Sequence, residues 1–191
     1  MSRVFPILAL WLAGCALTSN APPVQTREFT PERLEAAAPK PAASGEPTEI
    51  RLGRIRSSAN LRRHIVFRVS GVELAEYADL EWTENPEEYA RRAVSRALFD
   101  SGANRQAVGG GHPILDLELL AFEEVRHEKG RGGRVQISFS LHDEHQVLAS
   151  GVVTVEKDAS ASDISAVVVA IGDALEAAAR EVAEKVAAGQ R

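Results

Sequence analysis

The sequence predicts an α+β domain, a mostly antiparallel sheet of about five strands with two helices in the order β-β-α-β-β-β-α. Several short segments alternate apolar and polar residues, which is the pattern of strands with one buried face. Two other segments carry apolar residues at three- and four-residue steps, which is the pattern of amphipathic helices. Helices segregated over one side of a mostly antiparallel sheet make an α+β domain.

The first two predicted strands are residues 48–56 and 64–71. The alternation slips at Gly53 in the first strand but is regular in the second. The extended conformation continues from Leu74 to Trp82, which brings the chain to the first predicted helix.

That helix begins at Asn85-Pro86-Glu87-Glu88. The asparagine suits the N-cap, the proline suits the first turn, and the two acids favour the positive end of a helix. The helix ends near Asp100-Ser101-Gly102, where the glycine suits a left-handed position after the last turn. Its narrow apolar stripe consists of Ala90, Ala93, Val94, Ala97 and Leu98.

Three more strands and a long helix follow. The strands are residues 114–122, 134–142 and 146–156, and the polar turn His142-Asp143-Glu144-His145 joins the last two into a hairpin. The helix, residues 163–187, has an amphipathic stripe that can cover one face of the sheet. The stripe comprises Ile164, Val168, Ile171, Leu175, Ala178 and Val182.

The N-terminus has the pattern of a bacterial lipoprotein leader. Arg3 precedes an apolar run, residues 4–12, that is too short to cross a hydrocarbon core, which needs about 20 residues as a helix. A basic start, a short apolar stretch and small residues before a cut point are typical of a secretory signal. Leu12-Ala13-Gly14-Cys15 is similar to the lipobox, in which cleavage precedes the cysteine and its thiol receives a diacylglycerol. Because the chain has one cysteine, Cys15 cannot form an internal disulfide, and we expect it to carry lipid; the alternative is an ordinary signal peptide that contains a cysteine.

We divide the chain into a signal peptide at residues 1–14, the lipidated Cys15 with a Pro/Ala-rich tether at residues 15–47, and a domain at residues 48–191. The tether holds six of the nine prolines and few large apolar side chains, so it cannot bury enough surface to offset the entropy of ordering. Several acyl chains hold a protein durably on a membrane. Since Ala16 rather than Asp follows the cysteine, we expect attachment to the outer membrane, facing the periplasm.

Charge is distributed in blocks. The formal net charge is −5, and nothing indicates a nucleic-acid binder. Residues 51–68 hold six arginines and no acid, whereas residues 73–88 hold seven acids and no base. Such blocks are typical of solvated faces that pair with one another in the fold. The alternative is that the arginines, with Arg51, Arg54 and Arg56 first among them, form a surface for a partner or for anionic headgroups.

A tyrosine, four residues and a tryptophan precede the first helix, in Tyr77-Ala78-Asp79-Leu80-Glu81-Trp82. Leu115-Asp116-Leu117-Glu118-Leu119 lies in the strand after that helix, and Val147-Leu148-Ala149-Ser150 follows the hairpin turn. In this order and spacing, residues 48–188 and the lipobox resemble the ABC-type transport auxiliary lipoproteins, the PqiC/YmbA-like family that accompanies MCE-type lipid transport systems. The long tether, and an arginine-rich first strand in place of the family's tyrosine-rich one, leave the particular transport system open.

The resemblance implies a non-catalytic accessory of an ABC/MCE-type lipid transport system, anchored in the outer membrane and facing the periplasm. The implied partners are an MCE-domain protein or an ABC permease, with a homo-oligomer left open, and no cofactor is implied. Tyr77 and Trp82 are the expected partner contacts. The alternative is that both aromatic side chains pack at a sheet edge.

No catalytic constellation emerges from the sequence. His142 and His145 suit zinc, but they lie in a predicted turn, where polar residues are expected. Gly109-Gly110-Gly111 lacks the Lys and Ser/Thr of a phosphate loop. We therefore expect no enzyme and no metal site. Two other functions stay open, a tethered lipoprotein that activates a peptidoglycan synthase and a metal-dependent periplasmic hydrolase.

Overall fold

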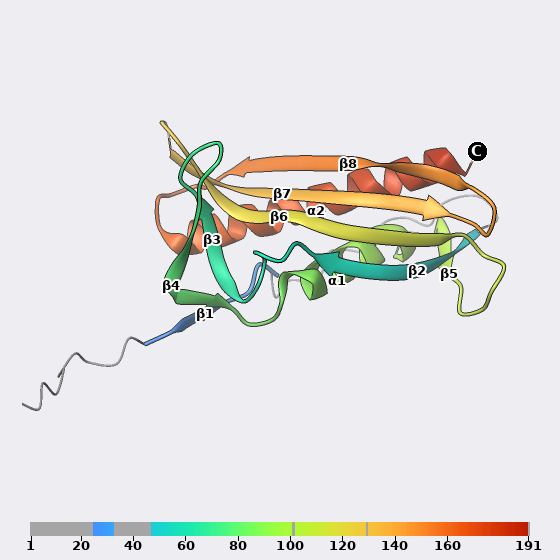
Figure 1. Ribbon diagram of the computed structural model, residues 1–191, viewed down its shortest axis with the longest axis horizontal. Helices are drawn as coiled ribbons and strands as arrows, with labels where there is room; N and C mark the ends of the chain where they lie inside the picture. Colours follow the sequence, from blue (N-terminus) through green and yellow to red (C-terminus); the bar gives the residue numbers. More distant parts are fainter. Residues whose placement is uncertain (1–24, 33–46, 101, 129, 191) are drawn as a thin grey trace, which may run out of the picture.

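The computed structural model describes residues 25–32, 47–100, 102–128 and 130–190 (Figure 1). In these ranges the chain forms eight strands and two helices. In chain order they are β1 (Arg27–Phe29), β2 (Thr48–Ser57), β3 (His64–Arg68), β4 (Leu74–Trp82), α1 (Pro86–Phe99), β5 (Asn104–Gln106), β6 (Ile114–His127), β7 (Gly130–His142), β8 (Val147–Asp158) and α2 (Ile164–Gly189).

The α+β class is confirmed, but the prediction of a mostly antiparallel sheet of about five strands is wrong. The eight strands form one mixed sheet in the order β1-β4-β3-β6-β2-β5, and β7 and β8 continue it from β6. Four of the seven strand pairings are parallel, namely β1–β4, β2–β5, β2–β6 and β3–β6. Between β3 and β6 the chain passes through β4 and α1, and such a long crossover allows β6 to run parallel to β2 and β3, while β4 runs in the opposite direction.

The long strand β6 organises the sheet. The first part of β6, from Ile114 to Leu119, pairs with β2, and the later part, from Glu123 to Val125, pairs with β3. Strand β7 runs antiparallel along the whole of the other side of β6. As a result, β2 and β3 lie one after the other along the same side of β6, each beside a different half of it.

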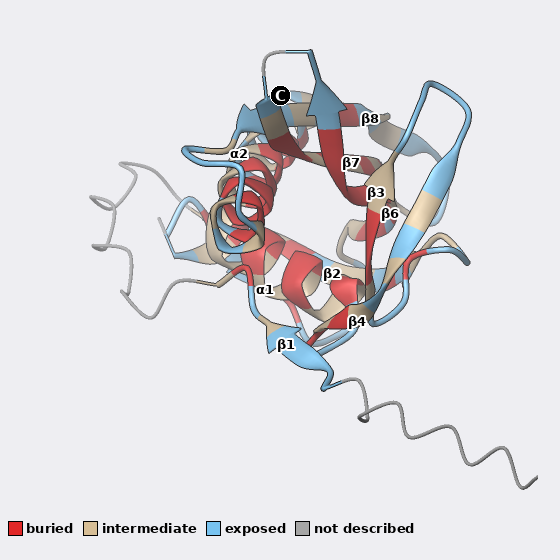
Figure 2. Ribbon diagram, turned by 90° about the vertical axis from the view of Figure 1, so that its left-hand side faces the viewer, coloured by how far each residue is buried: buried red, intermediate tan, exposed pale blue. Residues whose placement is uncertain are grey.

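Both helices cover one face of the sheet, which curves around them with its buried side inward (Figure 2). Helix α2 packs against β7, β8 and α1, while α1 also contacts β2 and β5. The core between sheet and helices contains the largest fully buried side chains of the described residues. Among them are Trp82, Tyr89, Phe122, Ile137, Ile171 and Leu175.

Both predicted helices are confirmed. Pro86 opens α1 and two acids occupy its first turn, although Asn85 makes no side-chain cap hydrogen bond. Gly102 has a φ of 71°, as the predicted left-handed position requires. Helix α2 is capped by Asp163, whose carboxylate accepts a hydrogen bond from the N–H of Ala166 at 3.1 Å.

Three features of the sheet were not predicted as such. The extended run after residue 71 is a separate strand, β4, which pairs with β3 in an antiparallel hairpin. The short strands β1 and β5 were not expected, and β1 lies within the range that we assigned to the tether. The division into leader, tether and domain stays a prediction. Among the described residues, no helix has both the length and the apolar character that crossing a membrane requires.

Candidate functional site

The arginines of β2 stand on the outer face of the sheet, the face turned away from the helices. Ile55 is buried, whereas Arg51, Arg54 and Arg56 are exposed. Strict alternation would place Arg54 and Arg56 on the same side as Leu52, which packs against the core. The register with β6 shifts between Leu52 and Ile55, and this bulge turns the two arginines outward. The predicted slip in the alternation is therefore confirmed.

The bulge depends on Gly53 and Asp116. A Cβ at Gly53 would lie 2.3 Å from Oδ1 of Asp116 and 2.5 Å from Cγ2 of Ile114, so a larger residue does not fit. The same Oδ1 accepts a hydrogen bond from the backbone N–H of Arg54 at 2.6 Å. Oδ2 of Asp116 lies 3.4 Å from Nε2 of His142 on β7. Asp116 is therefore engaged in holding the bulge against β6 and β7.

A shallow groove of about 250 Å³ runs over this part of the outer face. Its polar lining consists of Arg54, Arg56, Ser138 and Ser140 together with two acids, Asp116 and the exposed Glu118. Within the described parts of the chain, no ion pair joins either arginine to an acid. Unpaired guanidinium groups beside hydroxyl donors suit a carboxylate or phosphate, which Arg can bind with two parallel hydrogen bonds.

Tyr77 belongs to a different site, a cluster of charged groups on the inner side of the sheet. Its hydroxyl lies 2.7 Å from Oε2 of Glu124, and it accepts hydrogen bonds from Arg126 at 2.8 Å and Arg131 at 2.6 Å. The Tyr77 ring packs on Phe67, with 4.7 Å between ring centroids, and the Arg126 guanidinium lies 3.9 Å from the Phe67 centroid. All hydrogen-bonding directions of the hydroxyl are thus used inside the protein, which favours packing as the role of Tyr77.

Glu124 is the centre of this cluster. Its side chain is 0% exposed, and it accepts hydrogen bonds from Nε of both Arg126 and Arg131 at 2.7 Å. Burial raises the pKa of Glu124, but hydrogen bonds from Arg131, Arg126 and Tyr77 lower it more, so its pKa falls below the usual value. Burial and the neighbouring Glu124 carboxylate raise the pKa of Tyr77. Arg131 also donates to the carbonyl oxygen of Ser162, which ties the cluster to the loop before α2.

Trp82 is 0% exposed and lies in the core. Its ring centroid is 5.0 Å from that of Phe122 and 6.2 Å from that of Tyr89. The side chain therefore has no surface to offer a partner, and its position favours the alternative of aromatic packing. The structure does not bring Tyr77 and Trp82 together with the arginines of β2, since the aromatic side chains face inward and the arginines face outward. Cys15 lies outside the described residues.

The turn between β7 and β8 has a structural explanation. Oδ1 of Asp143 accepts hydrogen bonds from the backbone N–H groups of His145 at 2.7 Å and Gln146 at 2.8 Å. These two bonds lower the pKa of Asp143. His142 is engaged with Asp116. In the part of the chain that the structure describes, no three His, Cys, Asp or Glu side chains are grouped as metal ligands.

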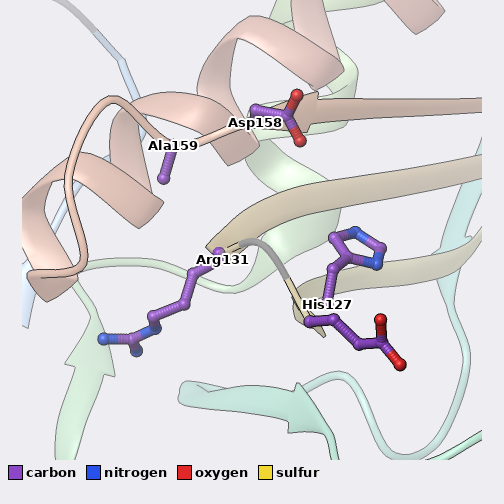
Figure 3. Close-up of a pocket in the computed structure, with 6 residues that line it drawn as sticks. His127, Arg131, Asp158 and Ala159 are labelled. Carbon is purple, nitrogen blue, oxygen red and sulfur yellow. The ribbon is translucent and has the colours of Figure 1, made fainter.

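A second cavity, of about 530 Å³, opens at the end of the β6–β7 hairpin (Figure 3). Its lining includes His127, Arg131, Asp158 and Ala159. The Arg131 guanidinium points away from His127 and Asp158, toward the loop before α2 (Figure 3). Since its polar groups do not converge on one point, this cavity lacks the arrangement of a catalytic site.

The Glu124 cluster was missed by the sequence analysis. The signal was an acidic pair, Glu123-Glu124, between Phe122 and Val125 in an otherwise apolar strand. Glu123 is 1% exposed and accepts hydrogen bonds from Arg68 at 2.7 and 3.1 Å. Buried acids require such partners, so an acid inside an apolar strand predicts a nearby arginine without saying which one.

The model of a family described as ABC-type transport auxiliary lipoprotein component matches residues 33–183. No curated protein matches the chain.

Several solved structures share the fold, including the three described next. A Xanthomonas campestris protein assigned to family model DUF330 is 20% identical, with a TM-score of 0.71, and the match covers 86% of this chain and 97% of that one. A protein described as uncharacterized is 11% identical with a TM-score of 0.67, covering 85% and 99% of the two chains. A hypothetical protein of Chlamydia trachomatis is 9% identical with a TM-score of 0.52, covering 74% and 96%. At these identities the likeness concerns the fold alone.

Proposed function

The chain belongs to the family of ABC-type transport auxiliary lipoprotein components, and from this membership we propose that it is the non-catalytic accessory of an ABC/MCE-type lipid transport system. The observation that carries the proposal is the extent of the family match, residues 33–183, which includes every strand from β2 to β8, helix α1 and most of α2. In this role the protein is attached to the outer membrane through lipid on Cys15 and faces the periplasm. The N-terminal pattern described above, with Ala16 after the cysteine, supports this location.

The outer-face groove is the surface that we assign to the transport partner. Arg54 and Arg56 are exposed and line the groove, and Arg51 continues the positive charge along β2. The three arginines outnumber the two acids of the groove, Asp116 and Glu118, and this excess of positive charge favours an acidic segment of an MCE-domain protein or of an ABC permease. Since a rim charge mainly affects association rate and selectivity, we expect the arginines to select the partner and the sheet face to supply the contact area.

Affinity recovery from gently solubilised envelopes tests the proposal. The lipidated protein is tagged, and the proteins that accompany it are identified by mass spectrometry. We expect an MCE-domain protein or its permease. Reversing the charge of the groove with Arg54→Glu and Arg56→Glu should reduce the recovery of this transport protein at least about tenfold. A tenfold reduction corresponds to the loss of one good charge-assisted contact.

A matched control carries the same change of charge elsewhere. Arg180 and Lys185 are exposed on α2, on the far side of the core from the groove, and replacing both by Glu should leave recovery unchanged. If both double variants lose the partner equally, the effect is one of net charge and the groove is not the binding surface. Recovery of a peptidoglycan synthase without any transport component would replace the transport function by synthase activation.

A further inference from the structure

Residues 27–32, which we call the strap, are docked on the domain although they lie in the range assigned to the tether. We propose that the strap sets the working length of the membrane tether: docked, it holds the domain close to the membrane, and released, it lets the domain move away. The inference rests on the proposed attachment of lipid to Cys15. It concerns the spacing between membrane and domain, which the proposed transport function leaves open.

The strap is joined to the edge of the sheet. Strand β1 pairs in parallel with β4, with Phe29 opposite Trp82. The backbone N–H of Thr83 donates to the carbonyl oxygen of Phe29 at 2.9 Å. The guanidinium of Arg63 donates to Glu28 at 2.6 Å. The Phe29 side chain is partly buried against the core, so backbone pairing, an ion pair and apolar contact all hold the same three residues.

The strap is also joined to both helices. Glu32 accepts hydrogen bonds from Nε of Arg92 at 2.9 Å and from Nη1 of Arg96 at 3.4 Å, both on α1. Burial raises the pKa of Glu32, but these bonds lower it more, and the net pKa lies below the usual value. Pro31 is buried against α2, where a Cβ added to Gly172 would lie 2.3 Å from the Pro31 carbonyl oxygen. The backbone of the strap therefore crosses α2 at a position where the helix has no side chain.

Docking divides the tether into two parts. Eleven residues, 16–26, separate Cys15 from the strap, and a chain of this length spans at most roughly 40 Å. If the strap is released, all residues from 16 to 47 separate the lipid from β2, and the maximum span rises to roughly 110 Å. The docked strap thus reduces the reach of the domain by more than half without changing the length of the chain.

The strap is also an element that can be released without unfolding the core. Strand β1 has three residues at the edge of the sheet, where it pairs with β4 alone. Short edge elements open at lower free energy than the core strands that they pair with. Two states of one molecule, near the membrane and extended from it, follow from this difference.

Two variants release the strap in different ways. Gly172→Ala places a methyl group against the Pro31 carbonyl, whereas in other respects alanine favours a helix over glycine. Glu32→Gln weakens the ion pairs with Arg92 and Arg96. The matched control is Glu176→Gln, because Glu176 pairs with Arg96 at 2.6 Å but does not touch the strap.

Hydrogen exchange of the Thr83 amide reports docking, measured by NMR on the chain from Cys15 to Arg191. We expect the exchange rate to rise roughly 100-fold with Gly172→Ala, about tenfold with Glu32→Gln, and less than about twofold with Glu176→Gln. The amide of Ala159, which donates to the Arg131 carbonyl at 2.8 Å, should exchange at the same rate in all four proteins. Equal Thr83 exchange in the wild type and in a folded Gly172→Ala variant would overturn docking.

The spacing is measured after coupling the Cys15 thiol to a maleimide lipid in a supported bilayer. Neutron reflectometry should place the near side of the wild-type domain within roughly 40 Å of the headgroups, and Gly172→Ala should extend the distribution beyond that limit. Identical profiles for the two proteins would show that the strap does not set the tether length. Because this coupling is chemical, the result does not depend on lipidation in the cell. Lipidation in the cell is tested separately, by mass spectrometry of Cys15 in protein isolated from cells. An unmodified cysteine would refute the proposed lipid anchoring but would leave the docking of the strap unaffected.

Discussion

Replacing Glu124 by glutamine removes the negative charge at the centre of the buried cluster while keeping the shape of the side chain. The carboxylate accepts four hydrogen bonds of 2.6–2.7 Å, two from Arg131, one from Arg126 and one from the Tyr77 hydroxyl. Glutamine keeps one oxygen and turns an NH₂ group toward these donors. Removing one partner of a buried ion pair typically costs about 3–5 kcal/mol. Because Arg126 is 42% exposed and can turn toward water, we expect the low end, a loss of about 3 kcal/mol in the free energy of unfolding.

The effect should depend on pH with a definite sign. The folded-state pKa of Glu124 lies below its usual value, although burial opposes this, because Arg131, Arg126 and Tyr77 stabilise the ionised form. The stabilisation is therefore fully present above the usual pKa of an unfolded glutamate, and it is lost as the pH falls through the lower folded pKa. Protonated Glu124 resembles glutamine, so the difference between wild type and variant should shrink on acidification.

Urea unfolding at pH 7 and at stepwise lower pH measures both effects. The control is Glu156→Gln, since Glu156 is 46% exposed and lies 3.5 Å from Arg134; we expect a change below about 1 kcal/mol. A loss of less than about 1 kcal/mol for Glu124→Gln at pH 7, or a difference that does not decrease with pH, would refute the assignment of Glu124 as a buried, ionised acid.

Three further predictions follow. Trp82→Ala should lower the free energy of unfolding by about 3–5 kcal/mol in chemical denaturation, because it removes a fully buried ring. A loss below about 1 kcal/mol would contradict the burial of this side chain. Gly53→Ala should lower stability by about 1–3 kcal/mol, because its methyl group meets the Asp116 carboxylate, and an unchanged melting temperature would contradict the bulge geometry. Cys15→Ala should move the protein from the membrane fraction to the soluble fraction of cells. Retention on membranes after a high-salt wash would show that lipid on this residue is not the main attachment.

The elements predictable from the sequence are those with enough residues to show a period. Helix α2 has 26 residues and β7 and β8 have 13 and 12, so their stripes and alternation extend over several repeats. Strands β1 and β5 have three residues each, too few for any periodic signal. The order of strands in the sheet is not visible either, because alternation shows which side of a strand is buried but not which strand lies beside it.

In the candidate sites too, local features were predictable from the sequence and contacts between distant residues were not. The bulge of β2 was visible as a slip at Gly53, since a local change of face is a local property of the sequence. The role of Tyr77 was not, because it depends on Glu124, 47 residues later in the chain. The tyrosine–tryptophan spacing helped to identify the family, yet the inward direction of both rings follows only from the pairing of β4 with β3 and the core beneath it.

The two charge blocks show why some of the described arginines have no ion-pair partner. We expected residues 51–68 to pair with the acids of residues 73–88, and the second half of the arginine block does so in part, since Arg63 lies 3.6 Å from Glu81. Arg68 instead pairs with Glu123 on β6. The first half cannot reach the acids of β4, because β2 and the β3–β4 hairpin lie beside different halves of β6. Among the described residues, Arg51, Arg54 and Arg56 therefore have no ion-pair partner, and the cause is the topology of the sheet rather than an excess of arginine.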